Sequence, residues 1–172
     1  MSEAFSEEKS ICTHLGDDYE RFYGAVVPPI FENSLFVFEK FEDIIESFKE
    51  ERAYYLYTRG TNPTVEILEK KLAALEHGES CKCFSSGMAA ISSAMMTFVK
   101  QGDHILFVNN IYGPALKYAK YIEKYGVEHS ITLDTDIESI ERALKVNTRV
   151  IYLESPATMT FKMLDLKAIA DL

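Results

Sequence analysis

A short segment before an apolar run of helical period could bind an anion. It consists of Ser86, Gly87 and Met88, and the apolar run continues to about Val99. The first backbone N–H groups of a helix have no partner within the helix, and the helix dipole is positive at that end, so a phosphate group is favoured there. A serine and a glycine before a helix are also common as an ordinary cap, which leaves both interpretations open.

Two further positions carry side chains suited to the same kind of ligand. Tyr57 and Arg59 place a phenol and a guanidinium two residues apart, a pair that can hold phosphate oxygens by charge-assisted hydrogen bonds. Tyr112 lies just beyond an expected strand and before a glycine, so its ring could stack on a flat heterocycle and its hydroxyl could move a proton. The alternatives are a surface arginine beside a packed tyrosine, and packing for any one of the ten tyrosines.

The elements that must position these residues follow from the hydrophobic pattern, which from about residue 65 alternates short apolar runs with stretches of helical period. This pattern predicts an α/β fold with a mostly parallel sheet flanked by helices. The predicted helices cover residues 65–75, 88–99, 114–125, 136–145 and from 165 onward, and the predicted strands cover residues 81–84, 104–108, 127–133 and 149–153. We expect the helix after residue 87 to be buried, because it is apolar on most sides.

The first 60 residues differ from this pattern. Prolines restrict residues 26–30 to an extended backbone, and residues 39–50 could form one amphipathic helix. We therefore predict an N-terminal arm over residues 1–60, followed by a partial large domain over residues 61–172. The helical pattern from Asp165 runs to the last residue without a C-cap glycine, so we expect the chain to be truncated.

Composition excludes several classes of protein. The 27 acidic side chains outnumber the 18 lysines and arginines, which disfavours binding to nucleic acid or to an anionic membrane. No apolar run reaches the roughly 20 residues of a membrane span, and the polar, acidic start is unlike a targeting peptide, so we expect a cytoplasmic protein. Cys12, Cys81 and Cys83 form no disulfide framework, and the histidines are scattered, so we expect reduced thiols and no metal site.

The order of these segments resembles the Cys/Met metabolism (trans-sulfuration) family of pyridoxal-phosphate (PLP) enzymes, which has the type I, aspartate aminotransferase-like fold. The resemblance covers the chain from about Thr13 onward. It is carried by residues 24–30, 57–64, 75–79, 85–90, 102–106, 111–113 and 148–156.

The resemblance implies roles for the candidate residues. Tyr57 and Arg59 match residues that reach the cofactor phosphate of a neighbouring subunit. Ser86, Gly87 and Met88 match the segment that supplies backbone N–H groups to that phosphate. Tyr112 matches the tyrosine that stacks on the pyridine ring and assists proton transfer. An active site shared in this way implies a homodimer, and in this family usually a tetramer built from two dimers.

The resemblance also implies an activity, namely cleavage of a carbon–sulfur bond in an amino acid such as cystathionine, through loss of the α-proton and elimination of a thiol. Two departures from the family pattern bear on the type. Thr158 replaces an asparagine found in many members, which favours the cystathionine β-lyase type, and Pro114 replaces a cysteine typical of methionine γ-lyases. The alternatives are cystathionine or methionine γ-lyase, a γ-replacement enzyme such as cystathionine γ-synthase or O-acetylhomoserine sulfhydrylase, and a non-catalytic α/β cofactor-binding fragment.

The family's lysine that binds the cofactor covalently, and its aspartate that pairs with the pyridine nitrogen, match positions beyond Leu172. We therefore expect the 172-residue chain to be inactive by itself.

Overall fold

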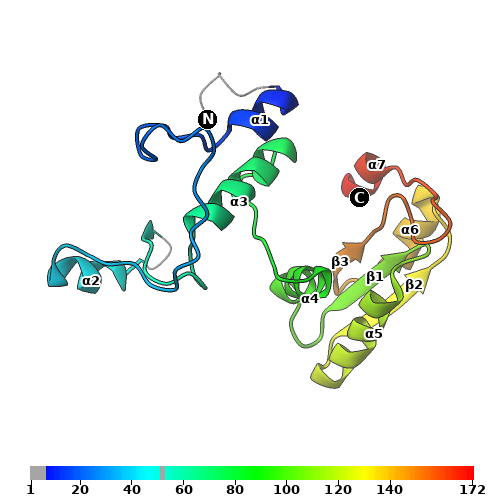
Figure 1. Cartoon of the computed structure of the whole chain (residues 1–172). Helices are drawn as coiled ribbons and strands as arrows, with labels where there is room; N and C mark the ends of the chain where they lie inside the picture. Colours follow the sequence, from blue (N-terminus) through cyan, green and yellow to red (C-terminus); the bar gives the residue numbers. More distant parts are fainter. Residues whose placement is uncertain (1–6, 51–52) are drawn as a thin grey trace. The chain divides into compact units, whose positions relative to one another are not determined.

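The computed structural model describes residues 7–50 and 53–172 (Figure 1). The chain divides into two compact units, one ending at Cys83 and the other beginning at Phe84. We call them the arm unit and the sheet unit and describe each by itself. The predicted division at residues 60 and 61 stays a prediction about the domains of the protein. Among the described residues, no helix combines the length and the apolar character that crossing a membrane requires.

The sheet unit is built on three parallel strands, with β1 in the centre. The strands are β1 (His104–Val108), β2 (Glu128–Thr132) and β3 (Thr148–Tyr152), in the order β2-β1-β3. Leu106 of β1 pairs with Ser130 on one side and with Ile151 on the other. Every residue of β1 is buried, as expected of a central parallel strand that is covered on both faces.

Helices cover both faces of this sheet. Ile105 and Phe107 of β1 face a cluster that includes Met95 of α4 (Gly87–Phe98) and Ala115 of α5 (Gly113–Ile122). A short 3-10 helix, η3 (Glu123–Tyr125), extends α5. The intervening residues of β1, Leu106 and Val108, face the opposite way, toward α6 (Ile137–Ala143) and α7 (Leu166–Ala170). Because successive side chains of a strand alternate between the two faces, one strand serves both halves of the core. The predicted α/β fold is confirmed.

Among its described residues, the arm unit contains three α-helices: α1 (Glu8–His14), α2 (Phe41–Ser47) and α3 (Pro63–Leu75). Asn62 caps α3, because its side-chain oxygen accepts a hydrogen bond from the Thr64 amide at 2.9 Å. The other end of the same amide group donates to the Phe31 carbonyl at 3.0 Å and to the Thr58 hydroxyl at 3.1 Å. One buried side chain thus ties residues near 31 and 58 to the start of α3.

Three predictions about these elements were wrong in whole or in part. The predicted strand over residues 81–84 is absent, because no described strand pairs with it and the Cys83 amide donates instead to the Glu69 carboxylate at 3.0 Å. The helix predicted over residues 39–50 spans only Phe41–Ser47. In α4 only Met95 is fully buried, so this helix covers the sheet with one side and exposes the other.

Candidate functional site

The first turn of α4 leaves backbone donors free. Ser86 caps the helix, with its hydroxyl oxygen accepting from the Ala89 amide at 3.1 Å. Its carbonyl oxygen accepts from the Ala90 amide, also at 3.1 Å. The amides of Gly87 and Met88 precede these two and have no acceptor within the helix. The sequence therefore folds locally into a helix start that offers two N–H groups to an anion.

The surroundings of Gly87 are open. A Cβ atom added to Gly87 would meet nothing within 4 Å, and the glycine has no left-handed backbone conformation. Neither a turn nor close packing within the chain therefore requires glycine here. A glycine is required, however, where a ligand approaches the backbone closely. The two free amides at this open helix start are suitable donors for the phosphate of a cofactor such as PLP.

Tyr112 stands at the start of α5, four residues after the end of β1. Its side chain is 46% exposed, which leaves the phenol ring accessible to a flat ligand. Its backbone amide donates a hydrogen bond of 2.8 Å to Glu154 Oε1. Because Glu154 follows β3, the neighbour of β1, this bond joins two loops at the carboxyl edge of the sheet, where ligands bind in open α/β folds.

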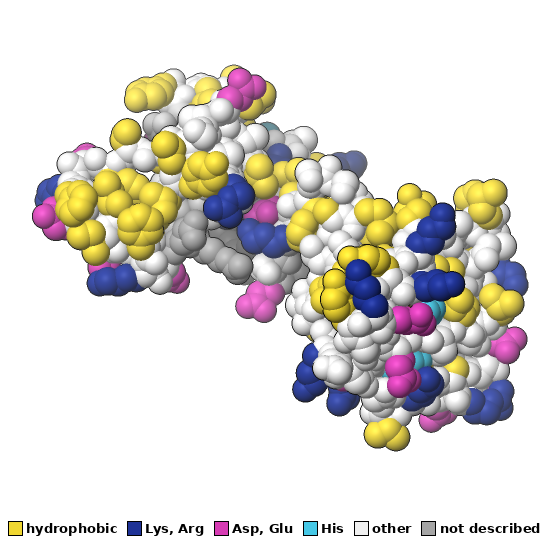
Figure 2. Space-filling view, turned by 90° about the horizontal axis from the view of Figure 1, so that it is seen from below, with side chains coloured by type: hydrophobic (Ala, Val, Ile, Leu, Met, Phe, Trp, Pro, Cys, Tyr) yellow, Lys and Arg dark blue, Asp and Glu magenta, His cyan; other side chains and the backbone are white. Residues whose placement is uncertain are grey.

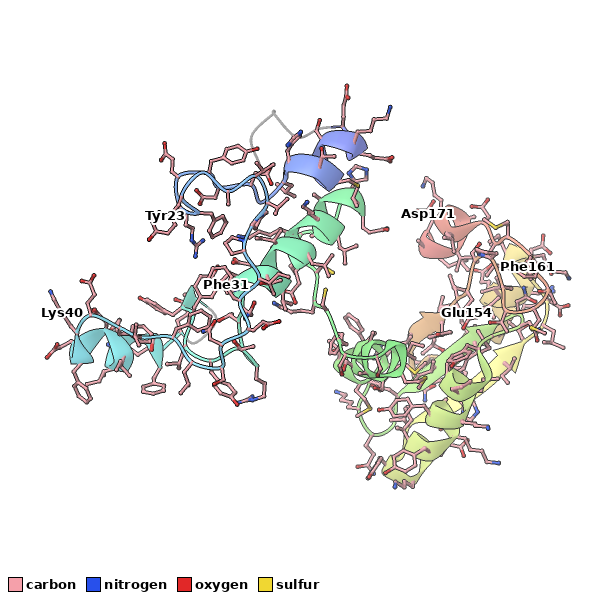
Figure 3. All side chains as sticks on the ribbon, viewed as in Figure 1. Tyr23, Phe31, Lys40, Glu154, Phe161 and Asp171 are labelled. Atoms are coloured by element: carbon pink, nitrogen blue, oxygen red, sulfur yellow. The ribbon has the colours of Figure 1, made fainter. Side chains whose placement is uncertain are left out.

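Glu154 accepts two more hydrogen bonds, and Figure 3 shows its position just beyond β3. The Tyr152 hydroxyl lies 3.3 Å from Oε1, and the Thr158 hydroxyl donates to Oε2 at 2.5 Å. Burial, followed by the charge of Glu154 and this hydrogen bond, raises the pKa of Tyr152 to about 12. Tyr152 therefore keeps its proton at neutral pH and acts as a donor to the carboxylate.

Tyr57 and Arg59 belong to the arm unit. The Arg59 guanidinium carbon lies 5.3 Å from the centre of the Tyr57 ring, within the range of a cation–π interaction. The backbone around them is held by a bridge between Tyr57 and Leu35 and by the Thr58 hydroxyl, which donates to the Asn33 carbonyl at 2.5 Å. In the described parts of the chain no carboxylate lies within 4.0 Å of Arg59. The guanidinium is thus available to an external anion.

The candidate residues therefore fall into two groups. Ser86, Gly87, Met88 and Tyr112 lie in the sheet unit, at the starts of α4 and α5, two helices in contact with each other. Tyr57 and Arg59 form the other group, in the arm unit. Glu154 lies within residues 148–156, one of the segments that carry the family resemblance, and its hydrogen bond with Tyr112, 42 positions away, was not predicted. An acidic residue immediately after a parallel strand was the available signal.

Cys12, Cys81 and Cys83 are free thiols with no predicted role in the candidate site. Burial raises the pKa of the Cys83 thiol, and the neighbouring Cys81 raises it further, so Cys83 is a protonated thiol at neutral pH. Residues 7–50 and 53–172 bring together no group of three histidine, cysteine or acidic side chains that could hold a metal ion. The thiols of Cys81 and Cys83 are partly buried, and that of Cys12 is exposed.

Comparison with known proteins agrees with the geometry. The family model described as Cys/Met metabolism PLP-dependent enzyme matches residues 9–172. The chain is 40% identical over 152 residues to L-methionine gamma-lyase of Fusobacterium nucleatum subsp. nucleatum, covering 88% of this chain and 38% of that protein. It is 38% identical over 150 residues to cystathionine beta-lyase MetC of Bacillus subtilis, covering 87% of this chain and 36% of that protein.

Solved structures give the same picture. The crystal structure of metB from Corynebacterium glutamicum matches with a TM-score of 0.87 and 30% identity, over 99% of this chain and 43% of that chain. A putative O-acetylhomoserine (thiol)-lyase from Campylobacter jejuni, whose structure contains pyridoxyl-lysine monophosphate, matches with a TM-score of 0.86 and 25% identity, over 96% of this chain and 41% of that chain. The chain spans about two fifths of the length of the curated relatives that it matches.

Proposed function

Because the chain belongs to the Cys/Met metabolism family of PLP-dependent enzymes, we propose that it forms part of an active site that cleaves a carbon–sulfur bond in a sulfur-containing amino acid. The observation that carries this proposal is the start of α4, with its two free amides and the open space beside Gly87. The curated relatives named above, a methionine gamma-lyase and a cystathionine beta-lyase, support the substrate class.

In this proposal the chain's own residues bind and orient the cofactor. The amides of Gly87 and Met88 bind the phosphate, and Ser86 holds the helix start in place by capping it. The ring of Tyr112 lies against the pyridine ring, and its hydroxyl moves a proton to or from the reacting amino acid. When bound, PLP supplies the electron sink that makes loss of the α-proton and departure of the thiol feasible.

Tyr57 and Arg59 take part in the site of a neighbouring protomer. Both side chains are exposed, and the guanidinium has no carboxylate partner among the described residues. They are therefore suited to bind the cofactor phosphate in the active site of a neighbouring protomer. Exposed apolar side chains on the same unit support an arrangement in which a second copy covers the arm. We propose a homodimer on this basis, with a dimer of dimers as the complete assembly.

For the reaction type we propose the cystathionine β-lyase class. Thr158 supports this choice, because its hydroxyl is bound to Glu154 and it cannot offer the amide of the asparagine that many family members carry there. Pro114, at the start of α5, supports it against methionine γ-lyase. Methionine γ-lyase is the second candidate, favoured by the relatives from Fusobacterium nucleatum, Treponema denticola and Porphyromonas gingivalis.

The phosphate site is tested by titrating the chain with pyridoxine 5′-phosphate, which cannot react covalently with lysines. We expect Gly87→Ala to weaken binding about tenfold, because the added methyl group keeps the phosphate away from the backbone amides. Gly78→Ala is the matched control, since its Cβ would make only an ordinary contact at 3.6 Å in the arm unit. Equal affinities for the wild type and Gly87→Ala would contradict the phosphate role of α4.

The reaction type is tested by fusing the chain to the remaining, C-terminal part of two relatives, from Bacillus subtilis and from Fusobacterium nucleatum. Cystathionine yields pyruvate, ammonia and homocysteine by β-elimination, whereas methionine yields 2-oxobutyrate, ammonia and methanethiol by γ-elimination. Pyruvate from cystathionine in both fusions supports the β-lyase proposal. Products that follow the C-terminal partner instead would show that this chain does not determine the reaction type.

A further inference from the structure

Glu154 has no part in the roles assigned above, yet it accepts hydrogen bonds from Tyr112, Tyr152 and Thr158. We infer that Glu154 is a positioning residue that holds Tyr112 and the loop containing Thr158 at the carboxyl edge of the sheet. This inference rests on the proposed function for the role of Tyr112, but the contacts themselves do not depend on it.

The carboxylate is surrounded by neutral donors. It accepts from the Tyr112 amide at 2.8 Å, from the Tyr152 hydroxyl at 3.3 Å and from the Thr158 hydroxyl at 2.5 Å. Among the described residues no lysine, arginine or histidine nitrogen lies within 4.0 Å of it. A partly buried carboxylate with three donors and no cation acts as a fixed acceptor rather than as a counter-ion.

Tyr112 depends on this acceptor because of its place in the fold. It is the N-cap residue of α5, and its own side chain makes no capping hydrogen bond. In a capping box, a glutamate of the first helical turn accepts from the N-cap amide. Here Glu154 performs that task from the end of the neighbouring strand, and its charge also suits the positive end of the helix dipole. The hydrogen bond to Glu154 therefore holds the Tyr112 backbone in place at the start of α5.

A second connection joins the same two loops. Asn110 donates its side-chain amide to the Thr158 carbonyl at 3.1 Å, while the Thr158 hydroxyl donates to Glu154. Two hydrogen bonds thus join the loop after β1 to the loop after β3, one from Asn110 to Thr158 and one from Tyr112 to Glu154. Removing the carboxylate would take away the acceptor of both the Tyr112 amide and the Thr158 hydroxyl. The start of α4, which binds the phosphate in our proposal, has no contact with Glu154 among these hydrogen bonds.

The experiment measures binding of pyridoxine 5′-phosphate and of inorganic phosphate to the 172-residue chain by calorimetry. We expect Glu154→Ala to weaken pyridoxine 5′-phosphate about tenfold and to leave inorganic phosphate unchanged. Glu154→Gln keeps an oxygen for the Tyr112 amide and should retain affinity within about threefold. Glu138→Ala, which removes an exposed carboxylate of α6, is the matched control and should change neither affinity.

A double-mutant cycle separates positioning from general loss of structure. If Glu154 acts through Tyr112, Glu154→Ala should have no further effect on pyridoxine 5′-phosphate binding in a Tyr112→Ala background. A purely structural role would weaken both ligands and would persist in that background. Either of these two results would overturn the inference.

Hydrogen exchange at the Tyr112 amide tests the positioning role of Glu154 without a ligand. We expect Glu154→Ala to speed this exchange at least about tenfold, with Glu154→Gln close to the wild type. If the wild type bound neither probe, the cofactor proposal would fail, and the exchange result would still support or overturn the positioning role. An unchanged exchange rate in Glu154→Ala would overturn it.

Discussion

The sheet unit buries many more apolar side chains than the arm unit, although both units also expose some. In the sheet unit, β1 is buried along its whole length, with helices on both of its faces. In the arm unit, Val37 is 99% exposed and Phe41 is 71% exposed, and hydrophobic side chains gather on the surface of this unit in Figure 2. The arm unit buries fewer apolar residues, among them Ile11, Phe22 and Ala74, and its buried Asn62 makes three hydrogen bonds within the unit.

The apolar surface buried in the sheet unit stabilises the chain by itself, whereas the apolar surface exposed on the arm unit is available to a partner. Burying apolar area contributes roughly 25 cal/mol per Å², and the sheet unit obtains this contribution within its own residues. The exposed side chains of the arm unit contribute nothing until something covers them. Contiguous exposed apolar surface of this kind marks interaction sites. In our proposal the covering surface is a second copy of the chain.

The largest expected effect lies at the centre of the sheet unit. Phe107 is fully buried, and its ring centre lies 5.1 Å from that of Tyr152 and 6.1 Å from that of His129. We expect Phe107→Ala to lower the free energy of unfolding by about 3–5 kcal/mol, through lost burial and the cavity left behind. Urea denaturation followed by circular dichroism measures this change. A loss below about 1 kcal/mol would mean that the sheet unit is not packed as described.

A smaller loss is expected at the polar centre of the arm unit. Asn62→Ala removes the cap of α3 and both hydrogen bonds to Phe31 and Thr58, and we expect a cost of about 2 kcal/mol. Asn33→Ala is the matched control, since Asn33 is exposed and donates one hydrogen bond to the Leu35 carbonyl. Hydrogen exchange of the α3 amides measures the effect locally. Equal protection in the two variants would show that the arm unit does not depend on Asn62.

The sequence predicted the elements of the sheet unit more successfully than their arrangement. The strand at 104–108 was predicted to the residue, and the two other strands to within one residue at each end, because apolar runs between turn signals are local features. The order β2-β1-β3 depends on pairing between distant segments, which periodicity does not encode. For the same reason, residues 81–84 were wrongly predicted as a strand, since a strand also needs a partner.

The candidate site shows the same division. Ser86 and Gly87 could be placed at a helix start from the sequence, because caps have a local signature. The hydrogen bond between the Tyr112 amide and Glu154 could not, since it links loops that only the parallel pairing of β1 and β3 brings together. The assignments of Tyr57, Arg59, Met88 and Tyr112 to the cofactor stay proposals until binding is measured.

A buried histidine makes the sheet unit sensitive to acid. His104 is fully buried in β1, with Nδ1 2.8 Å from the Thr148 hydroxyl oxygen and Nε2 2.8 Å from that of Ser130. Burial lowers its pKa below the ordinary value of 6.5, and Lys145 and His129 act in the same direction, while Glu128 opposes them. As the pH falls, His104 therefore binds a proton more readily in the unfolded chain than in the folded chain.

It follows that His104 contributes full stability above pH 6.5 and loses that contribution as the pH falls from 6.5 toward the lowered pKa of the folded state. We expect the free energy of unfolding to fall over this range, by less than the two substitutions above. His104→Gln should remove this part of the pH dependence, whereas the exposed control His77→Gln should preserve it. An identical pH profile in His104→Gln and the wild type would assign the effect to other groups.

The smallest effect on the isolated chain is expected at Phe41, on the exposed side of α2. Phe41→Ala should change the free energy of unfolding by no more than about 0.5 kcal/mol in dilute solution, because little apolar surface is buried there. If a second copy covers this face, the same variant should weaken self-association at high concentration, since association stabilises only the state that binds. Sedimentation velocity over a range of concentrations measures this, with Glu42→Ala on the same helix as the control. A large loss of stability in dilute solution without any change in association would show that Phe41 packs within its own chain, and the contrast between the two units would then disappear.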